Sequence, residues 1–207
     1  GLSPPSLTHL FGQDKLGRDL FSRILYGGRV SLGIGVIVLG ICLSIGVVIG
    51  AIAGLFGGKI DFFLMRLVDL FLAFPGILLA IAMAAVLGPS LFNIVIALSL
   101  LGWAGFARLV RGQILVAREE EYILAARALG LSPARIIQKH LLPNILAPVI
   151  VEATFGLAHI IVAEAALSFL GLGVQPPTPS WGGMLNDAKS FLLLAPHLVT
   201  IPGLVIM

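Results

Sequence analysis

Two long stretches without a single charged residue constrain this chain more than any other feature. Val30–Phe56 and Leu70–Ala107 contain no Asp, Glu, Lys or Arg. About 20 apolar residues are enough for a helix to cross the hydrocarbon core of a bilayer. Over the whole chain 58% of residues are hydrophobic and 11% are charged, against about 25% charged in soluble domains. The sequence therefore predicts an all-α integral membrane protein, a polytopic helical bundle, and excludes an ordinary soluble enzyme.

The apolar stretches divide into five predicted spans. Gly88-Pro89-Ser90 breaks the longer stretch into two helices, and Phe74-Pro75-Gly76 predicts a kink within the first of them. The spans are predicted at about 30–56, 62–87, 91–107, 145–171 and 197–207. The last is too short to cross a bilayer, so we expect a C-terminal truncation. The first residue is not Met, which suggests a missing N-terminus, and residues 1–29 lack the apolar core of a signal peptide.

Basic residues in the connections predict the orientation. Most lie between the third and fourth spans, in the segment 108–144, and Lys59 lies in the connection 57–61. Cytoplasmic loops of membrane proteins carry an excess of Lys and Arg. We therefore expect 108–144 and 57–61 in the cytoplasm, and 1–29 and 172–196 outside.

Three glycines at four-residue spacing lie on the first predicted span. Gly46, Gly50 and Gly54 share one helix face. Small residues let helices approach closely, and helix association in lipid depends on such packing. The stripe predicts a helix–helix contact, either fixed or moving during transport, and the sequence does not separate these two.

The cytoplasmic segment predicts a short helix–turn–helix. Glu119–Leu129 is predicted to be helical, with Gly130 just after its end, Ser132 as the N-cap and Pro133 as the first residue of a second helix. Attachment at both ends to membrane helices argues against DNA binding. A solvated loop is one alternative. The other is a docking element that presents an apolar surface to a soluble partner, formed by Ala125, Ala126, Leu129 and Ile136.

This segment resembles a known family. Ala125-Ala126-Arg127-Ala128-Leu129-Gly130, followed by Leu142-Pro143, is similar to the EAA loop of binding-protein-dependent ABC importer permeases. Leu124 and His140 depart from the general motif. Together with Tyr122 and Asn144, His140 fits the peptide and nickel subclass. Gly12–Asp19 and Leu167–Gly173 resemble two further signatures of that subclass, and all three point to its C-type permeases.

The resemblance implies a fold and a set of partners. It implies a type I ABC importer transmembrane domain over 30–207 after an external segment 1–29, with the first of six spans absent and the last cut short. It implies half of a translocation pathway, completed by a homologous B-type permease, with two ATPase subunits and an extracytoplasmic binding protein. No cofactor is expected in this chain, which has no GxxxxGK[ST] loop; ATP and Mg would be bound by the ATPase. The expected location is a bacterial or archaeal cytoplasmic membrane.

The resemblance also assigns candidate residues. Contacts with the ATPase are expected from the coupling loop, through Tyr122, Ala125, Ala126, Arg127, Leu129, Gly130, His140, Leu142 and Pro143. In the external loop, Pro177 and Trp181 are candidates for contact with the binding protein. A position in the interfacial belt is the alternative for Trp181.

Three ionisable residues interrupt the fourth span. Glu152, His159 and Glu164 should not face lipid, since a charge at mid-membrane costs about 3 kcal/mol even on the most lenient scale. They are candidates for lining a pathway, or for pairing with neighbouring spans. No metal site and no nucleic-acid partner are predicted.

Transport alternatives remain at this point. Within the same family, a nickel importer is the alternative to a peptide importer, which is favoured because no Cys/His cluster lies on a span. An ion-driven secondary transporter would use Glu152, His159 and Glu164 as a proton relay. An intramembrane enzyme would need His159 and Glu164 as metal ligands, but their spacing matches no HExxH-type motif.

Overall fold

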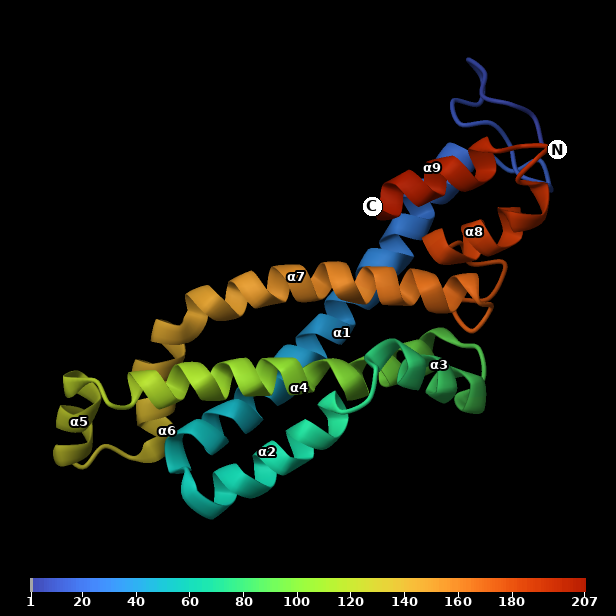
Figure 1. Cartoon of the computed structure of the whole chain (residues 1–207). Coiled ribbons are helices and arrows are strands. Elements are labelled where there is room, and N and C mark those ends of the chain that lie inside the picture. The colour runs from blue at the N-terminus through green and yellow to red at the C-terminus, as the bar shows by residue number, and fades with distance from the viewer. Residues whose placement is uncertain (1) are drawn as a thin grey trace. The chain divides into compact units, whose positions relative to one another are not determined.

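The computed structural model describes residues 2–207, and most of these residues are helical (Figure 1). They contain no β-strand, only an isolated bridge between Gln13 and Asp19. The elements are α1 (Leu20–Phe56), α2 (Gly58–Leu72), α3 (Gly76–Leu87), α4 (Leu91–Ala117), α5 (Glu121–Ala128), α6 (Pro133–Ile136), the π-turn η1 (Ile137–Leu141), α7 (Leu142–Phe169), α8 (Trp181–Ala188), the 3₁₀ turn η2 (Lys189–Phe191) and α9 (His197–Ile206).

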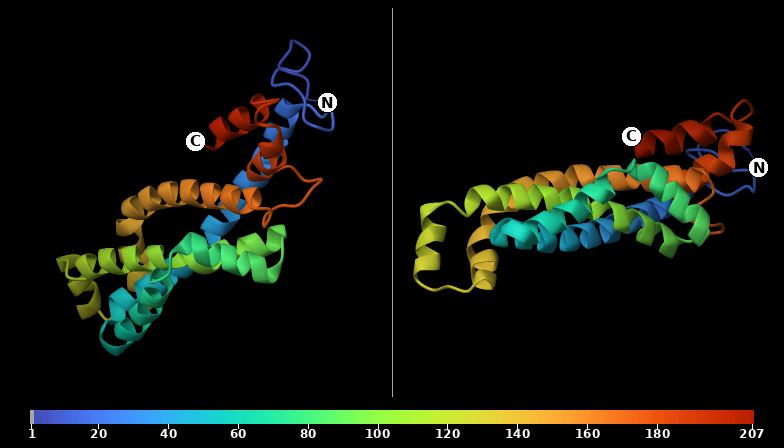
Figure 2. Two further views of the ribbon diagram at one scale, coloured as in Figure 1. Left: turned by 45° about the vertical axis from the view of Figure 1, so that its right-hand side comes forward. Right: turned by 60° about the horizontal axis from the view of Figure 1, so that its bottom comes forward.

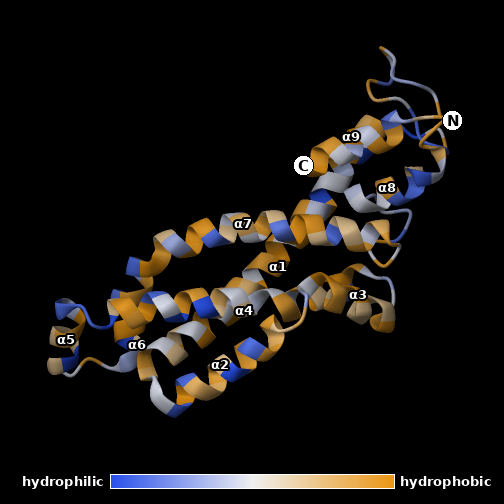
Figure 3. Cartoon of the chain, in the orientation of Figure 1, coloured by the Kyte–Doolittle hydropathy of each residue, from blue (hydrophilic) through white to orange (hydrophobic). Residues whose placement is uncertain are grey.

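Three continuous helices are long and apolar enough to cross a membrane: Leu20–Phe56, Leu91–Ala117 and Pro133–Phe169. A fourth span results if α2 and α3 are counted together. Hydrophobic residues dominate these helices, as the hydropathy colours of Figure 3 show. Pro75, which cannot donate a backbone hydrogen bond, lies in the break between α2 and α3, and this confirms the predicted interruption at 74–76.

The helix ends differ from the predicted span ends. The first helix begins at Leu20 rather than at residue 30, and α4 continues to Ala117 rather than ending near 107. Hydropathy marks the part of a helix that lies in lipid, whereas hydrogen bonding continues the helix past that part. On α4 the continuation carries Arg108 and Arg111, whose charges have acidic partners on α2.

The chain divides into two compact units, which are described separately. One comprises the chain up to Val38, Ile77–Leu98 and Leu157–Met207, and the other comprises Leu39–Gly76 and Ser99–Gly156.

In the second unit, α1 packs against α4 through the glycine stripe. A Cβ atom at Gly46 would lie 2.5 Å from Cβ of Phe106, and one at Gly50 would lie 2.5 Å from the carbonyl oxygen of Ala107. At Gly54 the nearest atom, on Ile114, would be 2.8 Å away. None of these sites has room for a methyl group. The predicted helix–helix contact is confirmed, and it is a contact of backbone against backbone.

In the first unit, α8 and α9 lie beside the beginning of α1 and the N-terminal segment (Figure 2). A buried apolar cluster joins these elements, formed by Leu20, Ile24, Met184, Ala188, Ala195 and Leu198. The predicted fifth span, 197–207, contains the ten-residue helix α9.

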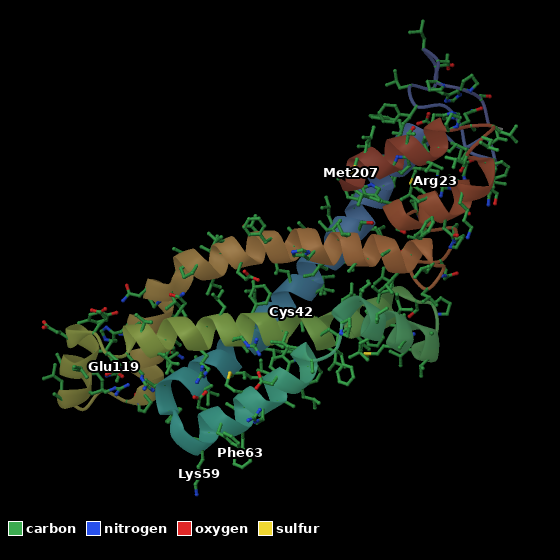
Figure 4. The ribbon with its side chains drawn as sticks, viewed as in Figure 1. Arg23, Cys42, Lys59, Phe63, Glu119 and Met207 are labelled. Carbon is green, nitrogen blue, oxygen red and sulfur yellow. The ribbon has the colours of Figure 1, made fainter. Side chains whose placement is uncertain are left out.

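Ion pairs hold the N-terminal segment on α1 and α8. Asp14 accepts hydrogen bonds from the backbone N–H groups of Leu16 and Arg18, both at 2.9 Å, and from Nε of Arg18 at 2.7 Å. Arg23 lies 3.2 Å from Asp14 and 3.8 Å from Asp187, which also pairs with Lys15 at 3.0 Å. Arg23, labelled in Figure 4, therefore bridges acids from two distant parts of the sequence.

We predict that acid releases this segment. Burial alone would raise the pKa of Asp14, but the bonds from Arg18 and Leu16 bring that pKa below its ordinary value. A carboxylate whose pKa is lowered by folding stabilises the folded state above its unfolded pKa, about 4, and loses this contribution as pH falls through the folded value. Proteolysis at residues 15–18 should therefore accelerate below about pH 4, and Asp14→Asn should accelerate it already at neutral pH. Equal cleavage of variant and wild type at neutral pH would contradict this.

Candidate functional site

The candidate site is α5, which crosses the end of α4 instead of continuing it (Figure 1). Glu119, at the junction of α4 and α5, is labelled in Figure 4. One side of α5 is buried: Ile123 is fully buried and Ala126 is 5% exposed. They join a cluster with Val110, Ile114, Ile136 and Leu141 of the same unit. The helix is therefore fixed to the ends of α4 and α7 by an apolar base.

The end of α5 forms a Schellman motif. Gly130 has a φ of 77°, the left-handed conformation that favours glycine. Its N–H donates to the carbonyl of Arg127 at 2.9 Å, and the N–H of Leu131 donates to the carbonyl of Ala126 at 3.1 Å. The predicted stop at Gly130 is confirmed, although α5 is shorter than the predicted 119–129.

The second predicted helix is not a separate element. It begins at Pro133 after Ser132, as expected, but it continues through η1 into α7. A proline ring clashes with the carbonyl four residues before it in an α-helix. The wider π-turn, which ends just before Leu142 and Pro143, accommodates this ring, so the helix does not break there.

Burial corrects part of the predicted docking surface. Ala126 and Ile136 are 5% and 2% exposed and belong to the apolar base, so they do not present themselves to a partner. Ile123 and Ala126, three residues apart, occupy the buried face of α5. The sequence alone did not specify which face this would be.

The opposite face of α5 is exposed and partly apolar. Leu129 is 80% exposed, Leu124 48% and Tyr122 41%, and Ala125 lies among them. We call Tyr122, Leu124, Ala125 and Leu129 the α5 surface. Large apolar side chains this exposed, on a helix whose other side is packed, form a small patch suited to a partner.

The other coupling-loop candidates surround this helix. The amide of Asn144 donates a hydrogen bond to the hydroxyl of Tyr122, which ties α5 to the beginning of α7. Arg127 is exposed, makes no ion pair with any described residue, and lines a shallow groove with Leu55, Phe56, Leu131, Pro133 and Ile136. Pro143 is exposed, His140 is partly buried, and Leu142 packs against the apolar base.

Ion pairs between α2 and α4 were not predicted. Asp61 pairs with Arg111, one bond measuring 2.6 Å, and Asp69 pairs with Arg108, also at 2.6 Å. On α2 itself, Arg66 lies 3.8 Å from Asp69, a longer contact. The signal in the sequence was that two arginines and two aspartates lie next to apolar spans, where each needs a partner. Lys59 and Phe63 point away from α4 (Figure 4).

The three pathway candidates do not come together. Glu152 and His159 are exposed on α7, whereas Glu164 is completely buried within the first unit. The expectation that Glu164 lines a pathway is corrected, because its side chain reaches no surface of this chain. Groups of three or more metal-ligating side chains are absent from residues 2–207.

Of the external candidates, Pro177 is exposed and Trp181 is partly buried. The indole Nε1 of Trp181 donates to the carbonyl of Ile24 at 3.0 Å, and its ring packs on Gly27 and Gly28. Trp181 therefore anchors the beginning of α8 to α1.

Comparison with known proteins identifies the family. Residues 46–207 match the family described as binding-protein-dependent transport system inner membrane component. The chain belongs to this family. The permease is thus a multi-pass inner-membrane protein, and its relatives are permease subunits rather than enzymes.

Two relatives resemble the permease over nearly its whole length. It is 50% identical to the dipeptide transport system permease protein DppC of Alkalihalophilus pseudofirmus, over 100% of this chain and 68% of that protein. It is 46% identical to the glutathione transport system permease protein GsiD of Escherichia coli O6:K15:H31, over 98% of this chain and 67% of that protein. These matches confirm the predicted resemblance to the C-type permeases of peptide importers.

A solved structure confirms the fold class. The permease resembles a chain of the MetNI methionine ABC transporter with a TM-score of 0.69 and 18% identity, over 90% of this chain and 89% of that one. At this identity the likeness shows the fold alone, which is that of a type I ABC importer permease.

Proposed function

We propose that the permease forms half of the translocation pathway of an ATP-driven importer of short peptides. The other half is a homologous B-type permease, two ATPase subunits bind on the cytoplasmic side, and an extracytoplasmic binding protein delivers the substrate. The observation that carries this proposal is the α5 surface, an exposed apolar patch on a helix whose other side is anchored by Ile123 and Ala126.

The geometry of α5 suits the transmission of force. A helix anchored through a buried base to two long helices moves with them as one body. An amphipathic helix laid in a groove of a partner is a common mode of recognition. We therefore assign α5 as the coupling helix, with Leu129 and Tyr122 in the cleft of the ATPase and Arg127 free to pair with an acidic residue there. ATP and Mg are bound by the ATPase.

The substrate class comes from the relatives. One is a dipeptide permease and the other a glutathione permease, and both substrates are short peptides. The exposed positions of Glu152 and His159 on α7 suit a role at the boundary with the partner permease, where a peptide's termini could meet them.

The test is to purify the full-length permease from its native host and identify its companions. We expect an ATPase and a second permease to copurify. Reconstituted with the binding protein in vesicles, the complex should take up a labelled dipeptide when ATP is present. Unlabelled dipeptide should compete for uptake; glutathione tests a second short peptide, and Ni²⁺ serves as the competitor of another class.

The controls separate the alternatives. Replacing ATP by ADP should reduce uptake to the background, while a protonophore should leave it unchanged. Uptake driven by a proton gradient without ATP would contradict the importer assignment. Competition by Ni²⁺ but not by peptides would contradict the peptide assignment.

A further inference from the structure

Glu164 is the one acidic side chain of residues 2–207 that is completely buried. It lies on the outer part of α7, within the first unit. Its Oε1 accepts a hydrogen bond from the hydroxyl of Ser168 at 2.7 Å, and its Oε2 has no hydrogen-bond partner among the described residues. The hydroxyl of Ser31, on α1, is also close to this carboxyl group. A carboxyl group is costly to bury, so its position calls for an explanation.

The two serines beside Glu164 receive the backbone of the external loop. Ser168 Oγ accepts the N–H of Val174 at 3.3 Å, and Ser31 Oγ accepts the N–H of Trp181 at 3.4 Å. Val174 and Trp181 lie at the two ends of the proline-containing loop that precedes α8. Glu164 therefore lies behind both points at which this loop is fastened to the spans α7 and α1.

Close backbone contacts occur at the same points. A Cβ atom at Gly173 would collide with Ser168, and one at Gly182 would collide with the carbonyl group of Ala165. A Cβ atom at Gly28 would lie 3.0 Å from the ring of Trp181. The loop therefore lies directly against the helices at these points, without room for a side chain at Gly173 or Gly182.

We propose that Glu164 is a positioning residue that holds the external loop and α8 on the outer parts of α1 and α7. It acts by orienting Ser168 and Ser31, whose oxygens then accept the N–H groups of Val174 and Trp181. The two helices and α8 move as one block because of these bonds. The role is one of hydrogen bonding and differs from a proton relay, in which the carboxyl group would have to exchange its proton with a surface.

The consequence for transport rests on the proposed function. If the binding protein docks on the external side, it meets a loop whose position is set by Glu164. Loosening this loop weakens productive docking more than it slows the steps that follow docking. The expected signature is a change in the half-saturating concentration of binding protein that exceeds the change in maximal rate.

The experiment compares Glu164→Gln and Glu164→Leu in the purified importer. The amide of glutamine still accepts the bond from Ser168, whereas leucine has a similar size but no polar atom. Hydrogen exchange measured over 172–183 should accelerate roughly five- to ten-fold in Glu164→Leu, as expected for the loss of about one hydrogen bond, and should resemble wild type in Glu164→Gln. Glu152→Leu, the same change at an exposed site of α7, is the matched control and should leave exchange there unchanged.

Transport measurements and serine variants complete the test. The half-saturating concentration of binding protein for ATPase stimulation should rise in Glu164→Leu and recover in Glu164→Gln. Ser168→Ala should accelerate exchange mainly at Val174, and Ser31→Ala mainly at Trp181, so the test does not depend on Glu164→Leu assembling. Unchanged exchange in both serine variants, or a Glu164→Gln variant that behaves like Glu164→Leu, overturns the proposal. Exchange is measured on the permease itself, so failure of the importer assignment would be seen separately, as the absence of an ATPase from the wild-type preparation.

Discussion

Replacing Leu129 by glutamate should release the ATPase from the permease while leaving the permease folded. Leu129 is 80% exposed at the end of α5 and does not belong to the apolar base below it. The substitution therefore removes little from the folded chain. In the proposed complex it removes an apolar anchor and places a charge in a dry cleft, which costs about 2 kcal/mol or more, roughly thirty-fold in affinity.

The measurement is the amount of ATPase that copurifies with tagged full-length permease. Leu193→Glu is the matched control, because Leu193 is 97% exposed, lies between η2 and α9, and receives the same chemical change. We expect wild type and Leu193→Glu to retain the ATPase and Leu129→Glu to lose it. Retention by Leu129→Glu would mean that α5 is not the coupling helix.

The spans and the turn at Gly130 were predictable because they depend on local chemistry. A run of apolar residues predicts a membrane helix from composition alone. A glycine after a helical stretch, followed by Ser132 and Pro133, predicts the end of one helix and the beginning of the next. Both kinds of signal are contained in a few neighbouring residues, so the apolar helices and the turn at Gly130 could be predicted even though the helix ends could not.

The helix ends and the buried faces were not predictable, since they depend on residues far away in sequence. The helix α4 extends past its apolar window because Arg108 and Arg111 find Asp69 and Asp61 on α2. Ala126 is buried because α5 packs on the end of α4. Neither partner can be identified from the local sequence.

Glu164, on α7, shows the same limit. The sequence placed a carboxyl group on an apolar helix. The free-energy cost of a charge in the hydrocarbon core was the only indication that this group avoids lipid. The sequence left open whether the Glu164 carboxyl group lines a pathway or pairs with a neighbouring span, either of this chain or of the partner permease. The structure supplies the hydroxyl of Ser168, four residues further along the same helix. Residues four apart share a helix face, so the sequence allows a bond between Glu164 and Ser168. It does not show that Glu164 is buried and therefore needs this bond.

The glycine stripe on α1 gives the last prediction, in which the same substitution has opposite effects at two sites of one helix. In a helix, alanine is favoured over glycine by about 0.5–1 kcal/mol, because glycine loses more conformational freedom on folding. At Gly40 a Cβ atom would meet nothing within 4 Å, so Gly40→Ala should be neutral or stabilising. At Gly50 the new atom would lie 2.5 Å from the carbonyl oxygen of Ala107 and 2.8 Å from Cβ of Val110. Neither neighbour is the end of a flexible side chain, so the helices must move apart.

Such overpacking typically costs about 1–3 kcal/mol, which exceeds the gain in helix propensity and reverses the sign of the effect. Thermal unfolding of the purified permease, followed by the loss of its monodisperse peak, should occur at lower temperature in Gly50→Ala than in wild type. Gly40→Ala should unfold at the wild-type temperature or above it. If both variants were stabilised, α1 and α4 could not be in backbone contact at Gly50. If both variants unfolded at a lower temperature than wild type, the destabilisation would not be specific to the contact at Gly50. Opposite shifts at two glycines of one helix would locate the helix contact at Gly50, on the face that also carries Gly46 and Gly54.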